Sequence, residues 1–554
     1  MAVTTPLPLE PLLDLLAADG RLVHLRRLPA RPAVTAELTR PLPPSLRERL
    51  PGTGLWAHQA AAIDLIRNGQ AVAVSTGTAS GKSLCYQLPV AEAAADPIRR
   101  GTALLVFPTK ALAHDQLRAL ADLNLPGVVP AAYDGDCTPE ERTWVRRHAN
   151  VVFTNPEMLH CALLPHHARW ATFLMRLRHV VVDELHVFRG IFGTHVAHLL
   201  RRLRRVAAHY RATPTFVFTS ATIGSPAGLG TALCGLPVEG ITDDGSPRGE
   251  RLVALWRPPL VDPDDPQSPR LSPHGETAGL VSEFVAAGRR TLAFCRSRRG
   301  TEVVAADARR RLPVELAETV RSYRGGYLAT ERRAIEAELF GGHLRGVVAT
   351  NALELGVDIG GLDACVLDGF PGTIASFWQQ AGRAGRERQE SVTVLVAGQD
   401  QLDQWLMTHP DELFSRPPEP AVVNPSNPFV LHTHLACAAY ELPLSPADDQ
   451  YWPDLLDEGV RELVLGDRLR VRPASGRRGQ PRAVWAGRGF PAHGVGLRSG
   501  SSSEFRIALD DGTLVGTVDE GRAFELVHPG AVYLHQGVAY RVADLDLDDR
   551  VAYV

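Results

Sequence analysis

Short apolar runs alternate with longer stretches of mixed polarity between about residue 45 and residue 240. The apolar runs lie at 70–75, 103–107, 151–153, 179–182 and 215–218. A strand buried on both faces reads as a nearly continuous apolar run, and strands that alternate with helices are typical of a parallel sheet covered on both sides. The pattern therefore predicts a first α/β domain over residues 45–240.

The same alternation returns after a stretch rich in proline and aspartate at 261–273, which we interpret as a linker. Its apolar runs lie at 291–295, 346–349, 364–367 and 392–396. They predict a second, similar α/β domain over residues 241–416. Residues 1–44 form an N-terminal extension with one expected helix, at 9–18.

The pattern changes again in the last quarter of the chain. A proline-rich hinge at 417–425 precedes two helical patterns, at 432–442 and 453–465, and a basic strand at 467–471. Two helices followed by a strand predict a winged-helix-like module over residues 417–475. Alternating polarity with turns at 511–512 and 520–521 predicts that residues 476–554 form a linker and a small β-rich domain.

Composition limits the function classes without choosing one. The chain has 554 residues, of which 45% are apolar and 22% charged, as expected for a globular protein of several domains. No apolar run is long enough to span a bilayer, and no signal peptide follows Met1. The seven cysteines include no C-x-x-C pair, so we expect no disulfide framework, no structural zinc, and a reducing, cytoplasmic location.

The net charge of −3 gives no general attraction to polyanions. A nucleic-acid surface would therefore have to be a local groove. Arginine-rich patches at 201–205 and 309–311 could line one, although each patch alone is more often a solvated helix face.

Lys82 and Lys110 are the chain's two lysines, against 57 arginines. Lys82 lies in a Gly-rich run at 76–83, between an apolar strand and an expected helix. A compact ammonium reaches between phosphate oxygens where a planar guanidinium does not fit, and the amides at the start of the helix would face the phosphates. Thr76 replaces the first glycine of the P-loop pattern. The run indicates a nucleotide site, and a Gly/Ser/Thr turn that contains a lysine is the alternative.

An acidic pair follows the buried strand at 179–182. Asp183 and Glu184 would lie at the carboxyl end of a parallel strand beside the phosphate loop, where one carboxylate can hold Mg²⁺ and the next can activate water. A solvated turn with two acids is the alternative for the Asp-Glu pair alone. The strand before the pair and His186 after it favour the catalytic interpretation.

Four motifs occur in the order found in superfamily 2 helicases. They are the runs 183–186 (DELH), 220–222 (SAT), 350–358 (TNALELGVD) and 379–386 (QQAGRAGR). The chain also resembles the mitomycin repair factor A group, which are bacterial DNA-repair helicases related to fungal RecQ4-like helicases. The amino-acid sequences that carry this resemblance lie at 76–83, 183–193, 323–327, 378–380 and 530–537. The resemblance extends from about residue 55 to the last residue. It implies that the two α/β domains are RecA-like.

The resemblance also implies a role for each matching position of an ATP site. Lys82 would hold the β- and γ-phosphates, and Glu184 would polarise the attacking water. Arg383 and Arg386 would neutralise the charge that develops on the γ-phosphate. The positions implied to contact adenine, the phosphate loop, Mg²⁺ or the nucleotide from the second domain are Gln59, Thr78, Ala79, Ser80, Gly81, Ser83, Asp183, Gly356 and Asp358. The positions implied to couple hydrolysis to domain movement are His186, Ser220, Thr222 and Gln379.

A further set of positions would contact a nucleic-acid strand. The motif positions in this set are Pro108, Thr109, Lys110, Thr154, Asn155, Pro156, Arg296 and Thr350. Hydroxyls, amides and one charge suit the tracking of phosphates without base readout, although each position alone could equally be a capped turn at a strand end. Arg468, Arg470 and Arg472 alternate on the expected wing strand and would place three charges on one face.

The leading hypothesis is an ATP-dependent DNA helicase or translocase of superfamily 2 that acts in DNA repair. By resemblance it would use ATP and Mg²⁺ and move 3′ to 5′ on single-stranded DNA or on a duplex with a 3′ tail. An RNA helicase is the alternative, because both use the same two-domain motor and the 2′-hydroxyl contact cannot be read from the motifs. A nucleotide switch or kinase would need no second α/β domain, and a catalytically inactive scaffold would not need the full set of ATP-site residues.

Two departures limit what the resemblance implies. Members of the group continue into a domain with a four-cysteine metal cluster, and this sequence contains no such cysteines. About twenty residues separate Asp358 from Gln379, which leaves no room for a long strand-splitting hairpin. A strand-separating wedge is therefore expected in the winged-helix-like module or the β-rich domain.

Overall fold

The computed structural model describes residues 8–17, 20–50, 52, 54–265, 267–354, 360–385, 389–473, 480–498 and 504–554. The chain packs into two compact units, each assembled from segments that are distant in the sequence. We call residues 34–246 and 419–500 the Lys82 unit, and residues 1–33, 247–418 and 501–554 the Arg383 unit. The five-part division of the sequence stays a prediction about domains, whereas the two units describe how the parts pack.

Among the described residues, the Lys82 unit is built on a seven-stranded parallel sheet with the order β10-β4-β9-β8-β5-β7-β6. Its strands are β4 (Ala71–Ser75), β5 (Thr102–Val106), β6 (Pro130–Ala132), β7 (Val151–Thr154), β8 (Leu177–Val182), β9 (Thr215–Ser220) and β10 (Val238–Ile241). Successive residues of β5 enter opposite cores, because Leu104 and Val106 pack on one face of the sheet while Ala103 and Leu105 pack on the other. The first α/β domain is thus confirmed.

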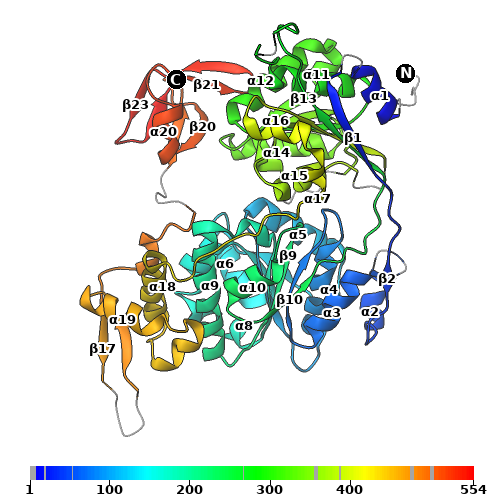
Figure 1. The fold of residues 1–554 in the computed structure, drawn as a ribbon. Coiled ribbons are helices and arrows are strands. Elements are labelled where there is room, and N and C mark those ends of the chain that lie inside the picture. Colours follow the sequence, from blue (N-terminus) through cyan, green and yellow to red (C-terminus); the bar gives the residue numbers. More distant parts are fainter. Residues whose placement is uncertain are drawn as a thin grey trace. The chain divides into compact units, whose positions relative to one another are not determined.

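Helices cover both faces of this sheet (Figure 1). The longer ones are α3 (Ala57–Arg67), α4 (Lys82–Ala95), α5 (Lys110–Asp122), α6 (Pro139–His148), α9 (Gly190–His209) and α10 (Pro226–Cys234). Short elements are α2 (Pro44–Arg47), α7 (Pro156–Met158), α8 (Ala171–Met175) and the pair β2 (Thr35–Ala36) and β3 (Leu55–Trp56). Local sequence defines the helix starts. At α6, the Thr138 hydroxyl accepts from the Glu141 amide while the Glu141 carboxylate accepts from the Thr138 amide, which is a capping box.

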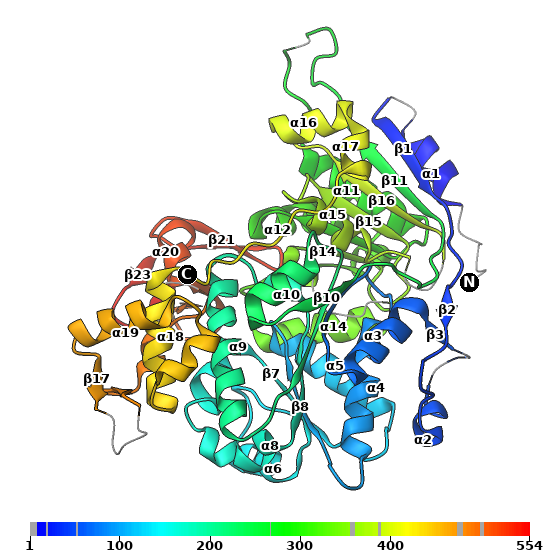
Figure 2. The same ribbon diagram turned by 60° about the horizontal axis from the view of Figure 1, so that its bottom comes forward.

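The winged-helix module belongs to the Lys82 unit and packs on its α/β domain. It comprises α18 (Pro428–Glu441), α19 (Leu456–Leu465) and the antiparallel hairpin of β17 (Leu469–Arg472) and β18 (Arg482–Trp485). Helix α18 lies beside α9 (Figure 2). Two hydrogen bonds hold the proline-rich hinge to α9: the Gly190 amide donates to the Val422 carbonyl at 2.7 Å, and the Asn424 amide donates to the Thr194 hydroxyl at 3.0 Å.

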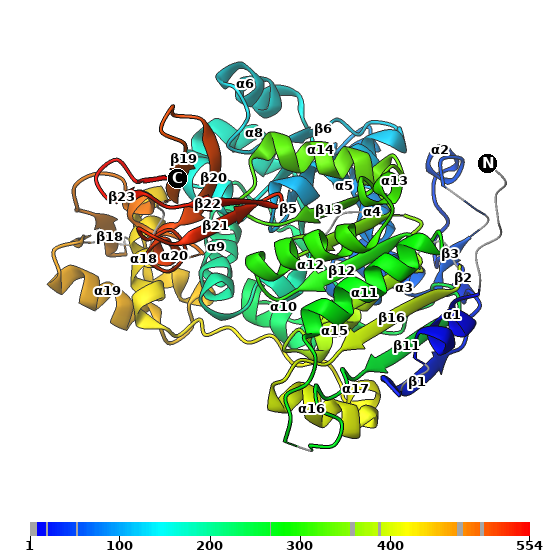
Figure 3. The same cartoon turned by 90° about the horizontal axis from the view of Figure 1, so that it is seen from above.

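The Arg383 unit contains the second sheet, with the order β1-β11-β16-β15-β12-β14-β13. Its strands are β1 (Leu22–Leu28), β11 (Arg251–Trp256), β12 (Thr291–Cys295), β13 (Val320–Tyr323), β14 (Gly346–Ala349), β15 (Ala364–Asp368) and β16 (Ser391–Val396). Strand β1 pairs antiparallel with β11 at the edge (Figure 3), and the others are parallel. The helix expected in the first 44 residues is α1 (Leu9–Leu16), but β1 was not predicted because charged residues interrupt its apolar positions, as suits an edge strand.

The linker interpretation of residues 261–273 is wrong. Strand β11 precedes this stretch and already belongs to the second sheet, where Leu252–Trp256 are buried beside β16. The stretch is an excursion within the Arg383 unit, closed by a bridge between Leu260 and Arg270. The helices of this unit are α11 (Pro273–Ala286), α12 (Arg298–Arg311), α13 (Val314–Ala317), α14 (Ala329–Phe340), α15 (Ile374–Ala381), α16 (Gln401–Thr408) and α17 (Pro410–Ser415).

The C-terminal β-rich domain packs on the Arg383 unit, with β21 against α12 (Figure 1). It contains β19 (Glu504–Ala508), β20 (Leu514–Asp519), α20 (Glu520–Leu526), β21 (Val532–His535), β22 (Val538–Arg541), β23 (Asp544–Asp546) and β24 (Val551–Tyr553). The buried ion pair of Glu302 and Arg324, on the second α/β domain, binds the backbone of this β-rich domain. Glu302 accepts the backbone amides of Gln536 and Gly537, both at 3.2 Å, and Arg324 donates to the Leu534 carbonyl.

Candidate functional site

The candidate residues of the Lys82 unit gather at the carboxyl edge of its sheet. The phosphate loop follows β4, the Pro108 run follows β5, the Thr154 run follows β7, the acidic pair follows β8, and Ser220 ends β9. The carboxyl ends of parallel strands share one edge, so the fold brings these five motifs together.

The loop at 76–83 is held in shape by its own side chains. The Thr76 and Ser80 hydroxyls lie 2.6 Å apart, and Ser80 also donates to the Gly77 carbonyl at 2.7 Å. Thr76 thus braces the loop at the position where the pattern expects glycine. Ala79 and Gly81 both adopt positive φ, at 57° and 60°. Thr78 is partly buried and Ala79 exposed.

Lys82 begins α4, and its ammonium is directed back into the loop. Its Nζ donates to the carbonyl oxygens of Gly77 at 2.6 Å and Thr76 at 3.1 Å. Burial lowers the pKa of Lys82, and the carboxylates of Glu184 and Asp183 oppose that shift. Its Nζ also lies 3.4 Å from the Ser80 hydroxyl, and such a partly buried cation, held by neutral oxygens beside two carboxylates, is suited to receive phosphate oxygens.

Gln59 and its neighbour His58 brace the loop from α3. Gln59 Nε2 donates to the Gly81 carbonyl at 2.9 Å, and His58 Nε2 lies 2.9 Å from the Ser80 carbonyl. A Cβ on Gly81 would come within 2.7 Å of Gln59 and 2.8 Å of Trp56, so glycine is required there. The adenine contact of Gln59 stays a prediction.

Asp244 belongs to the site and was missed from the sequence. Its carboxylate accepts the Gly77 amide at 3.2 Å, and its charge opposes the lowering of the Lys82 pKa by burial. It follows β10, the strand next to β4, in a segment without a motif. The adjacency of β10 and β4, which only the fold gives, would have been needed to find it.

Asp183 and Glu184 form a pair of neighbouring carboxylates. Asp183 is 8% exposed, and burial followed by the Glu184 charge raises its pKa to about 7. The Thr219 hydroxyl donates to Asp183 Oδ1, and the Glu184 amide donates to the same oxygen at 2.8 Å. Glu184 has φ 55°, a conformation that costs a non-glycine residue about 1–2 kcal/mol. Such strain is typical of functional sites.

The expected coupling residues of this unit meet beside the acidic pair. His186 Nδ1 lies 3.4 Å from Glu184 Oε2 and 3.2 Å from the Ser220 hydroxyl. His186 therefore bridges the loop after β8 and the end of β9. Thr222 is exposed two residues further on. Ser83, the expected Mg²⁺ ligand, donates to Gln116 Oε1 at 2.8 Å.

Several expected strand-contacting residues cap local turns. The Thr109 hydroxyl accepts the Leu112 amide at 3.3 Å, and the Asn155 carboxamide accepts the Met158 amide at 2.9 Å. The Thr154 hydroxyl donates to the Tyr133 carbonyl at 2.8 Å. Pro156 begins α7, next to Asn155. The capped-turn alternative thus describes the local geometry, while their contact with nucleic acid stays a prediction.

Lys110 and Arg498 carry positive charge at these same turns. Lys110 is exposed and pairs with Asp136 at 2.7 Å. Arg498, which was not predicted, donates to Glu157 at 2.6 Å and to the Pro108 carbonyl, and its guanidinium lies 4.4 Å from the centre of the Phe192 ring. Arg498 follows the winged-helix hairpin, so it ties that module to the Pro108 and Asn155 turns. Its position has no motif around it.

The candidate residues of the Arg383 unit surround Glu354. Arg383 is 2% exposed and donates to the Glu354 carbonyl, and Gln380 Nε2 donates to the Glu354 carboxylate at 2.9 Å. Gln379 is buried on α15. Gly356, Asp358 and Arg386 lie outside the described residues, so their expected roles stay predictions.

Arg296 and Thr350 are both engaged within the Arg383 unit. Arg296 pairs with Asp403 at 2.7 Å and with Asp400 at 2.9 Å. The Thr350 hydroxyl accepts the Ala352 amide at 3.4 Å. Arg296 remains half-exposed in these ion pairs, and its contact with nucleic acid stays a prediction.

The wing strand presents two of its three expected arginines to solvent. Arg470 and Arg472 are exposed, whereas Arg468 lies over the Trp485 ring with its guanidinium 5.7 Å from the ring centre. Arg472 is paired across the hairpin with Arg482, which was not expected. Like charges directly opposite each other destabilise a hairpin, so this arrangement favours an anionic partner.

Two RecA-like sheets, a phosphate loop and a strained carboxylate pair define the class of nucleotide-driven motor proteins. Residues 56–228 match the DEAD/DEAH box helicase family, residues 277–388 the helicase conserved C-terminal domain, and residues 423–500 the winged helix domain of ATP-dependent helicase HRQ1. The chain belongs to this family of ATP-dependent helicases and is an ATP-hydrolysing enzyme. The predicted winged-helix module is confirmed by the same comparison.

Relatives with curated descriptions support this membership. An uncharacterized ATP-dependent helicase, YprA, of Bacillus subtilis is 41% identical over 535 residues, 93% of this chain and 69% of that protein. ATP-dependent helicase HRQ1 of Saccharomyces cerevisiae is 36% identical over 100% of this chain, which spans about half (52%) of that protein. A crystal structure of the DUF1998 helicase MrfA bound to DNA and AMPPNP superposes with a TM-score of 0.91, at 38% identity, over 99% of this chain and 76% of that one.

The resemblance to the mitomycin repair factor A group is thereby confirmed. Within the part of the chain that the structure describes, no helix is long and apolar enough to cross a membrane.

Proposed function

We propose that this chain is a DNA helicase or translocase driven by ATP hydrolysis. The observation that carries the proposal is the arrangement of Lys82, Asp183 and Glu184 at one sheet edge, in a family with a DNA-bound relative that superposes over 99% of this chain. Arginines on the wing and at the turns of the same unit provide local positive charge on a chain whose net charge is −3. Such charge suits the phosphate backbone of a strand.

The residues present fit a magnesium ion bound with ATP. Two carboxylates are held together beside Lys82, and the raised pKa of Asp183 reflects burial and the neighbouring Glu184 charge. A divalent cation favours ionised carboxylates and so removes this cost. Asp183 and the Ser83 hydroxyl would hold the ion, which would neutralise charge on the phosphates.

Glu184 is the proposed general base. Its backbone amide donates to Asp183 at 2.8 Å, while one of its carboxylate oxygens lies 3.4 Å from His186 Nδ1. Glu184 would accept the proton of the attacking water and so lose its negative charge. His186 contacts both Glu184 and the Ser220 hydroxyl and would transmit this change to Ser220. Arg383 and Arg386 would neutralise the γ-phosphate in the transition state, as arginine fingers do.

The finer parts of the function rest on similarity. Movement 3′ to 5′ on single-stranded DNA and action in DNA repair follow from the resemblance to the mitomycin repair factor A group. A cytoplasmic location follows from the seven scattered cysteines. An RNA helicase stays the alternative, because no described residue identifies a 2′-hydroxyl contact.

Glu184→Gln tests the proposal, with Glu140→Gln on the exposed start of α6 as the matched control. Steady-state ATPase would be measured with single-stranded DNA, duplex DNA and RNA, and unwinding on duplexes with a 3′ or a 5′ tail. Glu184→Gln should lose about 10²–10⁴-fold in hydrolysis rate while still binding ATP and DNA. Hydrolysis near the wild-type rate in Glu184→Gln would remove the base assignment. Stronger stimulation of the ATPase by RNA than by DNA would favour the RNA helicase alternative. Unwinding only of duplexes with a 5′ tail would contradict the proposed 3′ to 5′ movement.

A further inference from the structure

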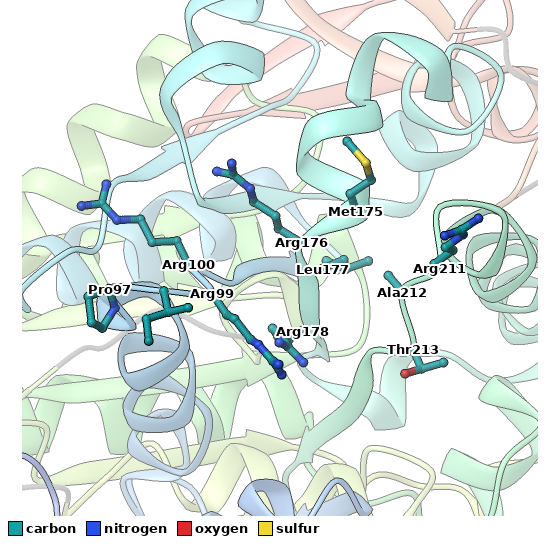
Figure 4. Close-up of a pocket in the computed structure, with 11 residues that line it drawn as sticks. Pro97, Arg99, Arg100, Met175, Arg176, Leu177, Arg178, Arg211, Ala212 and Thr213 are labelled. Atoms are coloured by element: carbon teal, nitrogen blue, oxygen red, sulfur yellow. The ribbon is translucent and has the colours of Figure 1, made fainter.

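A pocket of about 510 Å³ opens at the amino edge of the first sheet. Three loops line it, at 97–100 before β5, 175–178 at the start of β8, and 211–213 before β9. Figure 4 shows that side chains of all three loops surround it. Its polar lining includes five arginines and no acid, namely Arg99, Arg100, Arg176, Arg178 and Arg211.

The described part of the chain offsets only a small part of the positive charge of this pocket, through the attraction of Asp96 to Arg99 and Arg178. All five arginines are exposed, and none of their guanidiniums makes an ion pair or hydrogen bond with a described residue. Asp96 lies behind one loop, where its carboxylate accepts the amides of Ile98 at 2.8 Å and Arg99 at 3.0 Å. One carboxylate cannot balance five guanidiniums, so the pocket attracts an anion.

Recognition here would rely on guanidinium groups rather than backbone amides. The amides of Ile98 and Arg99 are occupied by Asp96, the Arg176 amide donates to the Phe173 carbonyl, and the Arg211 amide donates to the Ala208 carbonyl. A phosphate cradle is built from several convergent amides and glycines, and the lining of this pocket contains no glycine. Guanidinium forks match carboxylates in two parallel hydrogen bonds.

The apolar part of the pocket distinguishes a peptide from a nucleic acid. No lining residue is aromatic, so no platform exists for stacking of bases. Ile98 is 88% exposed and Met175 56% exposed. Arginine and methionine are both enriched at protein interfaces, and exposed aliphatic groups beside charge suit a peptide that alternates acids with apolar residues.

We propose that this pocket binds an acidic peptide segment of a partner protein. Carboxylates of the segment would pair with the guanidiniums, and an aliphatic side chain would cover Ile98 and Met175. Strand β8 separates the pocket from Asp183, and its six residues span about 20 Å. A partner bound at the amino edge therefore leaves the phosphate loop and the turns at the carboxyl edge uncovered, so it can stay attached while the enzyme hydrolyses ATP.

Binding of a fluorescein-labelled peptide of glutamates and leucines to the full chain, followed by fluorescence anisotropy, tests this proposal. Arg99→Glu with Arg178→Glu should weaken binding about tenfold or more. Arg49→Glu with Arg147→Glu is the matched control, because both residues are exposed, carry the same charge and lie outside the pocket. The control should bind like the wild type, and both variants should keep the wild-type ATPase rate.

A second variant guards against misfolding. Arg100→Ala with Arg176→Ala removes two exposed charges without adding acids and should weaken peptide binding several-fold. Equal binding by wild type and both pocket variants, or no binding by wild type, overturns the proposal. A loss of oligo-dT binding that matches the loss of peptide binding would make this a nucleic-acid site, and displacement of the peptide by equimolar inorganic pyrophosphate would make it a phosphate site. Either result also overturns it.

Discussion

Glu441→Gln should weaken the attachment of the winged-helix module to the first α/β domain. Glu441 ends α18, and its carboxylate accepts Arg202 Nε of α9 at 3.1 and 3.2 Å as well as Arg202 Nη2. The Arg202 side chain is 0% exposed and the Glu441 side chain 1% exposed. Arg202 Nη1 donates to Nδ1 of His160 at 2.8 Å and of His434 at 3.1 Å, so every nitrogen of the guanidinium donates at least one hydrogen bond.

The substitution keeps the shape of the side chain and removes its charge. It leaves the Arg202 guanidinium buried beside a neutral amide, and loss of one partner of a buried ion pair costs about 3–5 kcal/mol. At about 2–4 °C per kcal/mol, the transition that includes the Lys82 unit should fall by about 6–20 °C. Replacement of both partners by methionine removes the uncompensated charge, so the double variant should recover most of this loss.

Calorimetry of the full chain, with limited proteolysis of residues 417–428, measures the effect. Glu458→Gln on the exposed face of α19 is the matched control and should shift the transition by less than about 0.5 kcal/mol. Proteolysis near α18 should accelerate in Glu441→Gln alone. A loss below about 1 kcal/mol in Glu441→Gln, or a double variant less stable than the single one, would refute the buried-pair reasoning.

Three further predictions concern pH, the wing and Arg498. Burial, and for each a neighbouring arginine, lowers the pKa of His160 and His198 to about 3, so the unfolded chain binds more protons. Their stabilisation is therefore complete only well above pH 6.5 and is lost as the pH falls towards 3, and calorimetry at pH 5.5 should show about 1 kcal/mol less stability per histidine than at pH 6.5. Neutralising Arg470 and Arg472 should lower the salt slope of DNA binding by about one unit for each phosphate that the wing then fails to bind, with basal ATPase unchanged, and an unchanged slope would make the wing a solvated face. Arg498→Ala should weaken binding of single-stranded DNA several-fold with little change in basal ATPase, and Arg488→Ala on the exposed loop after the hairpin is its control.

The chain's chemistry was predictable where motif and strand coincide. Strands β12 and β14 begin and end at the predicted residues, and Asp183 follows β8 as expected. Buried strands of parallel sheets have few polar residues, so an apolar run bounded by polar residues defines both ends of the strand. For the same reason the residues directly after each strand were found.

Residues that act across the fold were not predictable. Strand β1 carries charges at its exposed positions, and its partner β11 lies more than 200 residues away. Asp244 and Arg498 reach the site from segments without motifs, because the adjacency of β10 to β4 and of Arg498 to α7 is a tertiary property. A single sequence contains the hydrophobic period of each element but not which elements become neighbours.

Buried arginines explain how the C-terminal modules become parts of the two units. Arg202 pairs with Glu441 of the winged-helix module, and Arg205 on the same helix pairs with Asp448 at 2.8 Å. In the Arg383 unit, Arg324 and Glu302 form a pair that is 1% and 2% exposed and that binds the backbone of the β-rich domain. A guanidinium has donors in several directions and can satisfy a carboxylate and a second group at once, which an ammonium does less well when buried. Each module is thus fixed to one α/β domain, so a wedge on either module would move with that domain during the ATPase cycle rather than swing on a linker.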